Sequence, residues 1–144
     1  MALNGWPAKS LSGSRVAPVR FPIASGETFV YGNLVVLDAS GDVTECGADP
    51  SEILGWAAEN AADVVESGYV MVYVATNDAI FAMQPSAGTI TEAAIGEDYG
   101  VVLASSVWLL DLTETTTVSM LVMSVDISRN LAFCKVLQSV RTFD

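Results

Sequence analysis

The strongest constraint on the fold of this chain is a regular succession of short runs of β-branched and aromatic residues, each ended by Gly, Asp or Asn. Residues 28–37 form such a run and stop at a turn sequence over residues 38–42. Gly, Asn and Asp are the residues that turns favour, and several short strands at this spacing are typical of sandwiches and barrels. The pattern predicts an all-β fold, a small antiparallel sandwich or barrel.

We expect seven to nine strands between residues 27 and 144. Residues 68–76 carry valines at every second position, so Val70, Val72 and Val74 share one face of a strand. Tyr69 and Tyr73 lie on the other face, and we expect both faces to be covered. One helical turn is expected over residues 90–96. The expected strands are 28–37, 43–46, 53–58, 68–76, 79–83, 101–105, 107–112, 117–127 and 131–137.

Residues 1–26 differ from the rest of the chain because they contain Pro7, Pro18 and Pro22 with Gly and Ser between them. Proline removes a backbone donor and favours extended chain, so residues 15–23, with two prolines, cannot form a central strand. We predict an extended N-terminal arm (residues 1–26) and a β body (residues 27–144). The arm could lie along the edge strand of a neighbour, and a disordered terminus is the alternative.

Charge is divided between the two parts. The arm holds Lys9, Arg15 and Arg20 and no acidic residue, a charge of +3, whereas the body holds all 17 acidic residues against three cations, a charge of −14. A body this acidic repels phosphate backbones, so we expect no nucleic-acid partner. The apolar runs never reach the roughly 20 residues that cross a bilayer, and no leader pattern precedes them, so we expect synthesis in a cytoplasm.

The residue types argue against catalysis. The 144 residues include no histidine, the commonest general base and a frequent metal ligand. Cys46 and Cys134 fit no metal-binding spacing, so we expect two buried thiols, with a disulfide as the alternative. Asp38 and Asp42 could bind calcium, but Asp at such a turn more often bonds its own backbone. We predict no catalytic residue, no cofactor and no metal site, and therefore not an enzyme.

The three tryptophans have different expected roles. Trp56 and Trp108 lie in apolar runs, so we expect them in the core rather than in a sugar-stacking platform. Trp6 lies in the arm, where a large aromatic side chain could anchor in the pocket of a partner.

Three segments of the body resemble tailed-phage capsid decoration proteins, also called cement or head auxiliary proteins. The segments are GNLVVLDASGDV (residues 32–43), ILGWAAE (53–59) and VYVA (72–75) with Phe81. The resemblance implies a homotrimer on the capsid exterior of a virion, made in the host cytoplasm. It also implies that the arm adds to a strand of the major capsid protein.

The arm residues that we expect to bind a partner are of two kinds. Its cations suit an acidic surface, and its apolar side chains would anchor the contact. A carbohydrate- or receptor-binding module of a phage tail or fibre is the main alternative function, and an enzyme of unknown type is the third. The expected partner-binding residues are Trp6, Lys9, Arg15, Arg20, Phe21 and Ile23.

Overall fold

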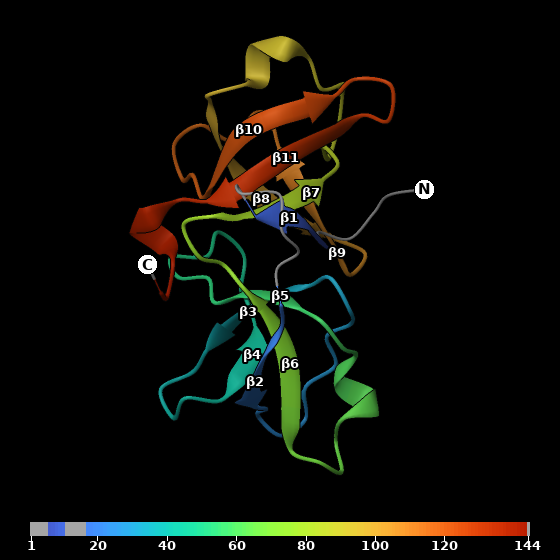
Figure 1. Cartoon of the computed structure of the whole chain (residues 1–144), viewed down its shortest axis with the longest axis vertical. Coiled ribbons are helices and arrows are strands. Elements are labelled where there is room, and N and C mark those ends of the chain that lie inside the picture. The colour runs from blue at the N-terminus through green and yellow to red at the C-terminus, as the bar shows by residue number, and fades with distance from the viewer. Residues whose placement is uncertain (1–5, 11–16, 144) are drawn as a thin grey trace.

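The computed structural model of the chain describes residues 6–10 and 17–143, which form two antiparallel sheets (Figure 1). Nine of the eleven strands, β3 to β11, lie beyond residue 27, so the predicted all-β fold is confirmed. The described residues contain three short 3-10 helices and no α-helix: η1 (Ala61–Asp63), η2 (Glu92–Ala94) and η3 (Gln138–Val140).

The six-stranded sheet has the order β1-β7-β11-β10-β8-β9 and the five-stranded sheet the order β2-β6-β5-β3-β4. Figure 1 shows the six-stranded sheet above and the five-stranded sheet below. The strands of the six-stranded sheet are β1 (Trp6–Ser10), β7 (Ala79–Met83), β8 (Asp98–Ala104), β9 (Val107–Asp111), β10 (Met120–Asp126) and β11 (Leu131–Val136). Those of the five-stranded sheet are β2 (Val19–Pro22), β3 (Leu34–Leu37), β4 (Val43–Glu45), β5 (Gly55–Ala57) and β6 (Tyr69–Val74).

Each sheet curls so that one of its edges is covered by another part of the chain. In the six-stranded sheet, Leu110 at the edge strand β9 exchanges hydrogen bonds with Gln84 and Ser86, of 2.9 and 2.8 Å. In the five-stranded sheet, the chain leaving β2 pairs with the edge strand β4, where Ala24 N donates to Val43 O at 3.1 Å. Covered edges of this kind protect a sheet from unwanted strand addition.

Apolar side chains form two cores. The larger core lies between the sheets and includes Trp56 and Trp108, both fully buried as the sequence predicts. The smaller core lies within the five-stranded sheet and includes Val70 and Val72. The opposite face of β6 is covered only in part, because Tyr69 is 44% exposed there. The expectation that both faces of this strand are covered is therefore wrong at Tyr69.

Local turn chemistry explains where the strands end. Asp38 Oδ1 accepts hydrogen bonds from the backbone N–H groups of Ser40 and Asp42 at 2.8 and 2.9 Å, as expected for a turn-stabilising Asp. Between β10 and β11, Asn130 adopts φ +54° and its Oδ1 accepts a bond from Ile90 N at 2.7 Å. The predicted helical turn over 90–96 is present as η2, although no side chain caps it.

Polar contacts fix how the two sheets sit against each other. Asn33, 1% exposed, donates from Nδ2 to Ser106 O at 2.9 Å, and Trp108 Nε1 donates to Glu45 Oε2 at 3.1 Å. The end of the chain adds a further link, because Ile53 N donates to Val140 O at 2.6 Å and Thr142 N donates to Ile53 O at 3.0 Å. These bonds tie the residues just before β5 to the segment that follows β11.

The structure incorporates part of the predicted arm into both sheets. Strand β1 pairs with β7, and strand β2 pairs with β6 from Val19 to Pro22. The sequence places the whole of residues 1–26 in an arm, whereas two stretches of it, residues 6–10 and 19–22, pair with strands of the body. The reason is that proline is accepted in an edge strand, where its missing N–H needs no partner.

We expect Gly55→Ala to destabilise the fold strongly. A Cβ at this position would overlap the backbone carbonyl of Tyr73 in the neighbouring strand, which cannot move without breaking the sheet. The expected loss in the free energy of unfolding is about 3 kcal/mol, the upper range for overpacking, measured by urea unfolding. Gly47→Ala is the control, because nothing lies within 4 Å of its Cβ position, and it should stay within about 0.5 kcal/mol. Equal stability of the two variants would contradict this packing.

Candidate interaction edge

The outer side of β2 is a sheet edge at which no other described strand is paired with Arg20. Ile23 N donates to Gly68 O on the β6 side, whereas Ala24 N donates away from β6, to Val43 O. Because successive residues of a strand point their backbone groups to opposite sides, Arg20 and Pro22 also face away from β6. Pro22 has no N–H, and its carbonyl faces Val43 N in the parallel bridge between Ile23 and Val43, so this edge offers one donor and one acceptor, both from Arg20.

Apolar side chains flank this edge on both faces of the sheet. Val19 is 48% exposed, and Phe143 is 46% exposed where it stacks on Phe21 at 6.5 Å between ring centroids. On the opposite face, the guanidinium of Arg20 lies 4.1 Å from the ring centroid of Tyr69. A donor and acceptor pair with exposed apolar groups beside it is the arrangement that accepts an added strand. We call these residues, Val19–Pro22 with Tyr69 and Phe143, the β2 edge.

The structure separates the six partner-binding residues predicted from sequence. Arg20 is exposed on the β2 edge, whereas Phe21 and Ile23 are half-buried against the smaller core. Trp6 and Lys9 lie in β1, opposite Ala82 and Ile80 of β7 in the other sheet. Arg15 and the side chains of β1 lie outside the described residues. The prediction of these six residues as a binding set therefore stays a prediction.

Sequence reasoning missed Tyr69 and Phe143 as members of this surface. Tyr69 belongs to a strand with a clear buried face, and nothing in its own neighbourhood marks its ring as exposed. Phe143 reaches the edge only because the end of the chain returns to β5. Neither position carries a local sequence signal for this placement.

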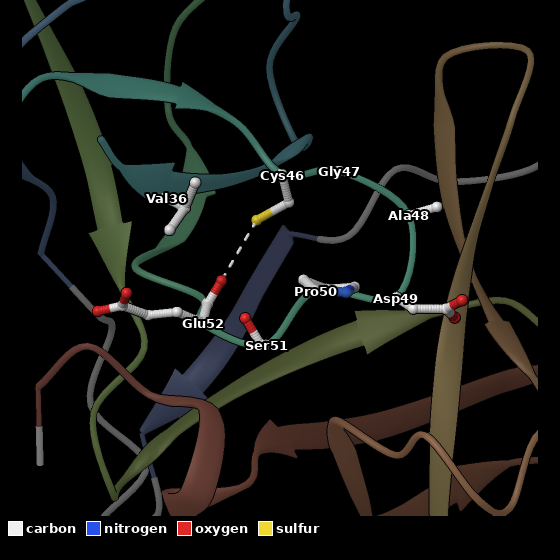
Figure 2. A pocket seen from close by; sticks show the side chains of 8 residues that line it. All are labelled: Val36, Cys46, Gly47, Ala48, Asp49, Pro50, Ser51 and Glu52. Carbon is white, nitrogen blue, oxygen red and sulfur yellow. Dashed lines mark hydrogen bonds between the residues drawn. The ribbon is translucent and has the colours of Figure 1, made fainter. Parts of the chain in front are cut away.

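A hollow lies beside the loop after β4. Figure 2 shows the residues that line it, with the Cys46 thiol donating to Glu52 O at 3.8 Å. The hollow has a volume of about 290 Å³. Burial, aided by the charges of Glu45 and Glu52, raises the pKa of the Cys46 thiol to about 12, so this sulfur is no nucleophile near neutral pH. The lining residues are Val36, Cys46, Gly47, Ala48, Asp49, Pro50, Ser51 and Glu52.

Negative charge dominates the described surface. The one ion pair within the described residues joins Arg129 to Asp126 at 2.7 Å. Hydrogen bonds from Arg129 and Ser128 lower the pKa of the Asp126 carboxyl to about 2, and bonds from Thr113 lower that of Asp111. These two carboxylates therefore stay ionised well into acid solution. On this acidic surface, the exposed guanidinium of Arg20 is a local positive charge.

Residues 6–10 and 17–143 hold no metal-binding cluster and no membrane-spanning helix. Within that range no three His, Cys, Asp or Glu side chains gather where they could hold a metal ion. No helix there has the length and apolar character needed to span a bilayer. Cys46 and Cys134 are both buried and free, as the sequence predicts, so the disulfide alternative is wrong. Comparisons with protein-family models, curated proteins and solved structures find nothing that matches this chain.

We expect both thiols to be unreactive in the folded protein. Burial raises the pKa of Cys134 to about 12, as for Cys46, and thiolate is the form that attacks thiol reagents. A chromogenic disulfide reagent at mildly alkaline pH should therefore release no colour from the native chain and two equivalents from the chain in denaturant. Rapid reaction of one equivalent with native protein would show that a cysteine is accessible.

Proposed function

We propose that this chain is a virion structural protein that binds the outside of a phage capsid and stabilises it as a homotrimer, with its arm region contacting the major capsid protein. The observation that carries the proposal is the position of the open strand edges. The covered edges, at β4 and β9, belong to the body, whereas β1 and β2, the end strands that no other described strand covers along their length, belong to the arm. Strand addition is therefore directed to the arm.

The β2 edge defines how a capsid segment would bind. An extended segment of the major capsid protein would lie antiparallel to Val19–Pro22 and exchange hydrogen bonds with the N–H and C=O of Arg20. Apolar side chains of that segment would contact Val19 and Phe143 on one face and Tyr69 on the other. Main-chain bonds supply affinity in this mode, and the flanking side chains supply specificity.

The distribution of charge also supports the β2 edge as the surface that binds the capsid. Arg20 presents a cation at the edge, so an acidic capsid segment is attracted there and a basic one is not. The remaining surface of the body carries most of the −14 charge, which keeps copies soluble before assembly and disfavours the phosphate backbone of packaged DNA. An acidic exterior body with a cationic attachment edge suits a protein that binds a shell from outside.

A carbohydrate- or receptor-binding module of a phage tail or fibre is the second candidate function, because tyrosines are exposed on the five-stranded sheet and in the turn before β3. Tyr31, 37% exposed, meets Tyr73 edge to face at 6.4 Å between ring centroids. Tyr69 is also exposed, but Arg20 occupies one face of its ring. A glycan array read with the purified chain distinguishes this function from capsid binding.

The proposal is tested by co-sedimentation with empty shells assembled from the major capsid protein of the same genome. Arg20→Ala removes the cation and keeps the outward N–H, whereas Arg20→Pro removes both and places a ring on the open edge. Both variants leave the bonds between β2 and β6 intact, because Arg20 faces away from β6. We expect Arg20→Ala to weaken binding several-fold and to reduce its salt dependence.

Arg20→Pro should weaken shell binding by about tenfold more than Arg20→Ala, since it removes a hydrogen bond worth about 1 kcal/mol and obstructs the added strand. Thermal unfolding of the two variants is the control and should give similar midpoints, because proline is tolerated in an edge strand. If both variants bind shells equally well, strand addition at the β2 edge is not the mode of attachment.

A further inference from the structure

The loop between β4 and β5 contains a peptide bond of unusual chemistry. The sequence has five prolines, and Pro50 is the one that follows an aspartate. The amide before a proline is tertiary, so its nitrogen takes up a proton more readily than that of an ordinary peptide. A side-chain carboxylate is a nucleophile that proteins use. Asp49 therefore places a nucleophile beside the carbonyl carbon of a bond whose nitrogen is a good leaving group.

The carboxyl of Asp49 is free to reach that carbon. Its side chain is exposed, and Figure 2 shows it on the outer side of the loop, away from the Cys46 thiol. No hydrogen bond or ion pair with another described residue holds this carboxyl. By contrast, Asp38, Asp111 and Asp126 each accept hydrogen bonds within their own turns. The Asp49 carboxyl can therefore rotate onto its own carbonyl carbon.

The backbone of Asp49 has a conformation that residues with a side chain rarely adopt. Its φ is +50°, in the left-handed region, where Cβ crowds the carbonyl oxygen that follows. Both ends of the loop are fixed, because Cys46 N donates to a carbonyl of β3 at 3.0 Å and Ile53 N donates to a carbonyl of η3 at 2.6 Å. Pro50 is buried. The surrounding structure imposes this φ, and backbone strain persists under that condition.

We propose that the bond between Asp49 and Pro50 is a self-cleavage site, cut by the Asp49 carboxyl. A carboxyl oxygen bonds to the Asp49 carbonyl carbon, and a proton from solvent adds to the Pro50 nitrogen. The bond from carbon to nitrogen breaks, its electron pair stays on nitrogen, and a cyclic anhydride of Asp49 remains. Water opens the anhydride, which restores the side-chain carboxyl and leaves a C-terminal carboxyl on Asp49. The net reaction consumes one water, and attack within one residue favours it.

Cleavage would divide the chain without separating its two parts. The first fragment, residues 1–49, contains β1 to β4, and the second, residues 50–144, contains β5 to β11. Strands of the first fragment pair with β5, β6 and β7 of the second. A cut is therefore seen only under denaturing conditions, where the two products together weigh one water more than the intact chain.

The variant Ala17→Asp tests the proposal with an internal reference. It creates a second bond between Asp and Pro, before Pro18, at an exposed position without a positive φ. The chain is incubated at the lowest pH at which circular dichroism still shows native β structure, and denatured samples are read by mass spectrometry. We expect bond 49–50 to break about tenfold faster than bond 17–18, because the crowding at Asp49 is released as the bond breaks. In urea at the same pH, where φ is no longer imposed, the two rates should be similar.

Asp49→Asn, combined with Ala17→Asp, is the matched control, because Asn also tolerates a positive φ and lacks the carboxyl. It should give the fragments of bond 17–18 and none of bond 49–50. Equal rates for the two bonds in the native chain, or an intact bond 49–50, would overturn the proposal. Fragments of bond 49–50 from the Asp49→Asn variant would overturn it as well. The assay contains no capsid, so its outcome is independent of the proposed function.

Discussion

The contact between Trp56 and Phe81 is the interaction on which the rest of the structure depends. Trp56 lies on β5 of the five-stranded sheet and Phe81 on β7 of the six-stranded sheet, with 5.0 Å between ring centroids and no exposed surface on either side chain. Losing a buried aromatic side chain of this size costs about 3–5 kcal/mol, a large part of the roughly 5–15 kcal/mol by which domains are stable. Because this contact holds the sheets face to face, the links through Asn33 and Ile53 can form, and the end of the chain comes to rest beside β2.

The same packing decides where the molecule can bind others. Once the sheets curl around their cores, residues 84–86 cover β9 and residues 23–24 cover β4, so β1 and β2 are the end strands that no other described strand covers along their length. A sheet edge is a general binding device and gives no specificity by itself. Here the flanking groups differ, because β2 has Arg20, Tyr69 and Phe143 beside it, whereas β1 borders a strand of the main core. Two edges with different surroundings can serve two different partners.

The sequence predicts those parts of the fold that depend on local chemistry. The turn at Asp38, the buried face of the strand with Val70 and Val72, and the burial of Trp56 follow from residue type and spacing, and each is confirmed. The β2 edge depends on contacts between distant segments: β2 with β6, and Phe143 with Phe21. Nothing in residues 19–22 specifies a partner around residue 70, since short apolar stretches with proline fit an arm and an edge strand equally well. The sequence therefore predicted the segment that contains the candidate site, but it did not predict which face of that segment is exposed.

The β2 edge combines features that permit one strand to add while discouraging uncontrolled association. It is four residues long, proline at its end removes one donor, and Arg20 places a charge at its centre. Short length, proline and an inserted charge are the means by which edge strands avoid pairing with copies of themselves. Two β2 edges brought together would oppose their arginines, whereas an acidic strand would meet a cation and a matched donor and acceptor. The features that prevent aggregation at this edge are therefore also those that select an acidic partner.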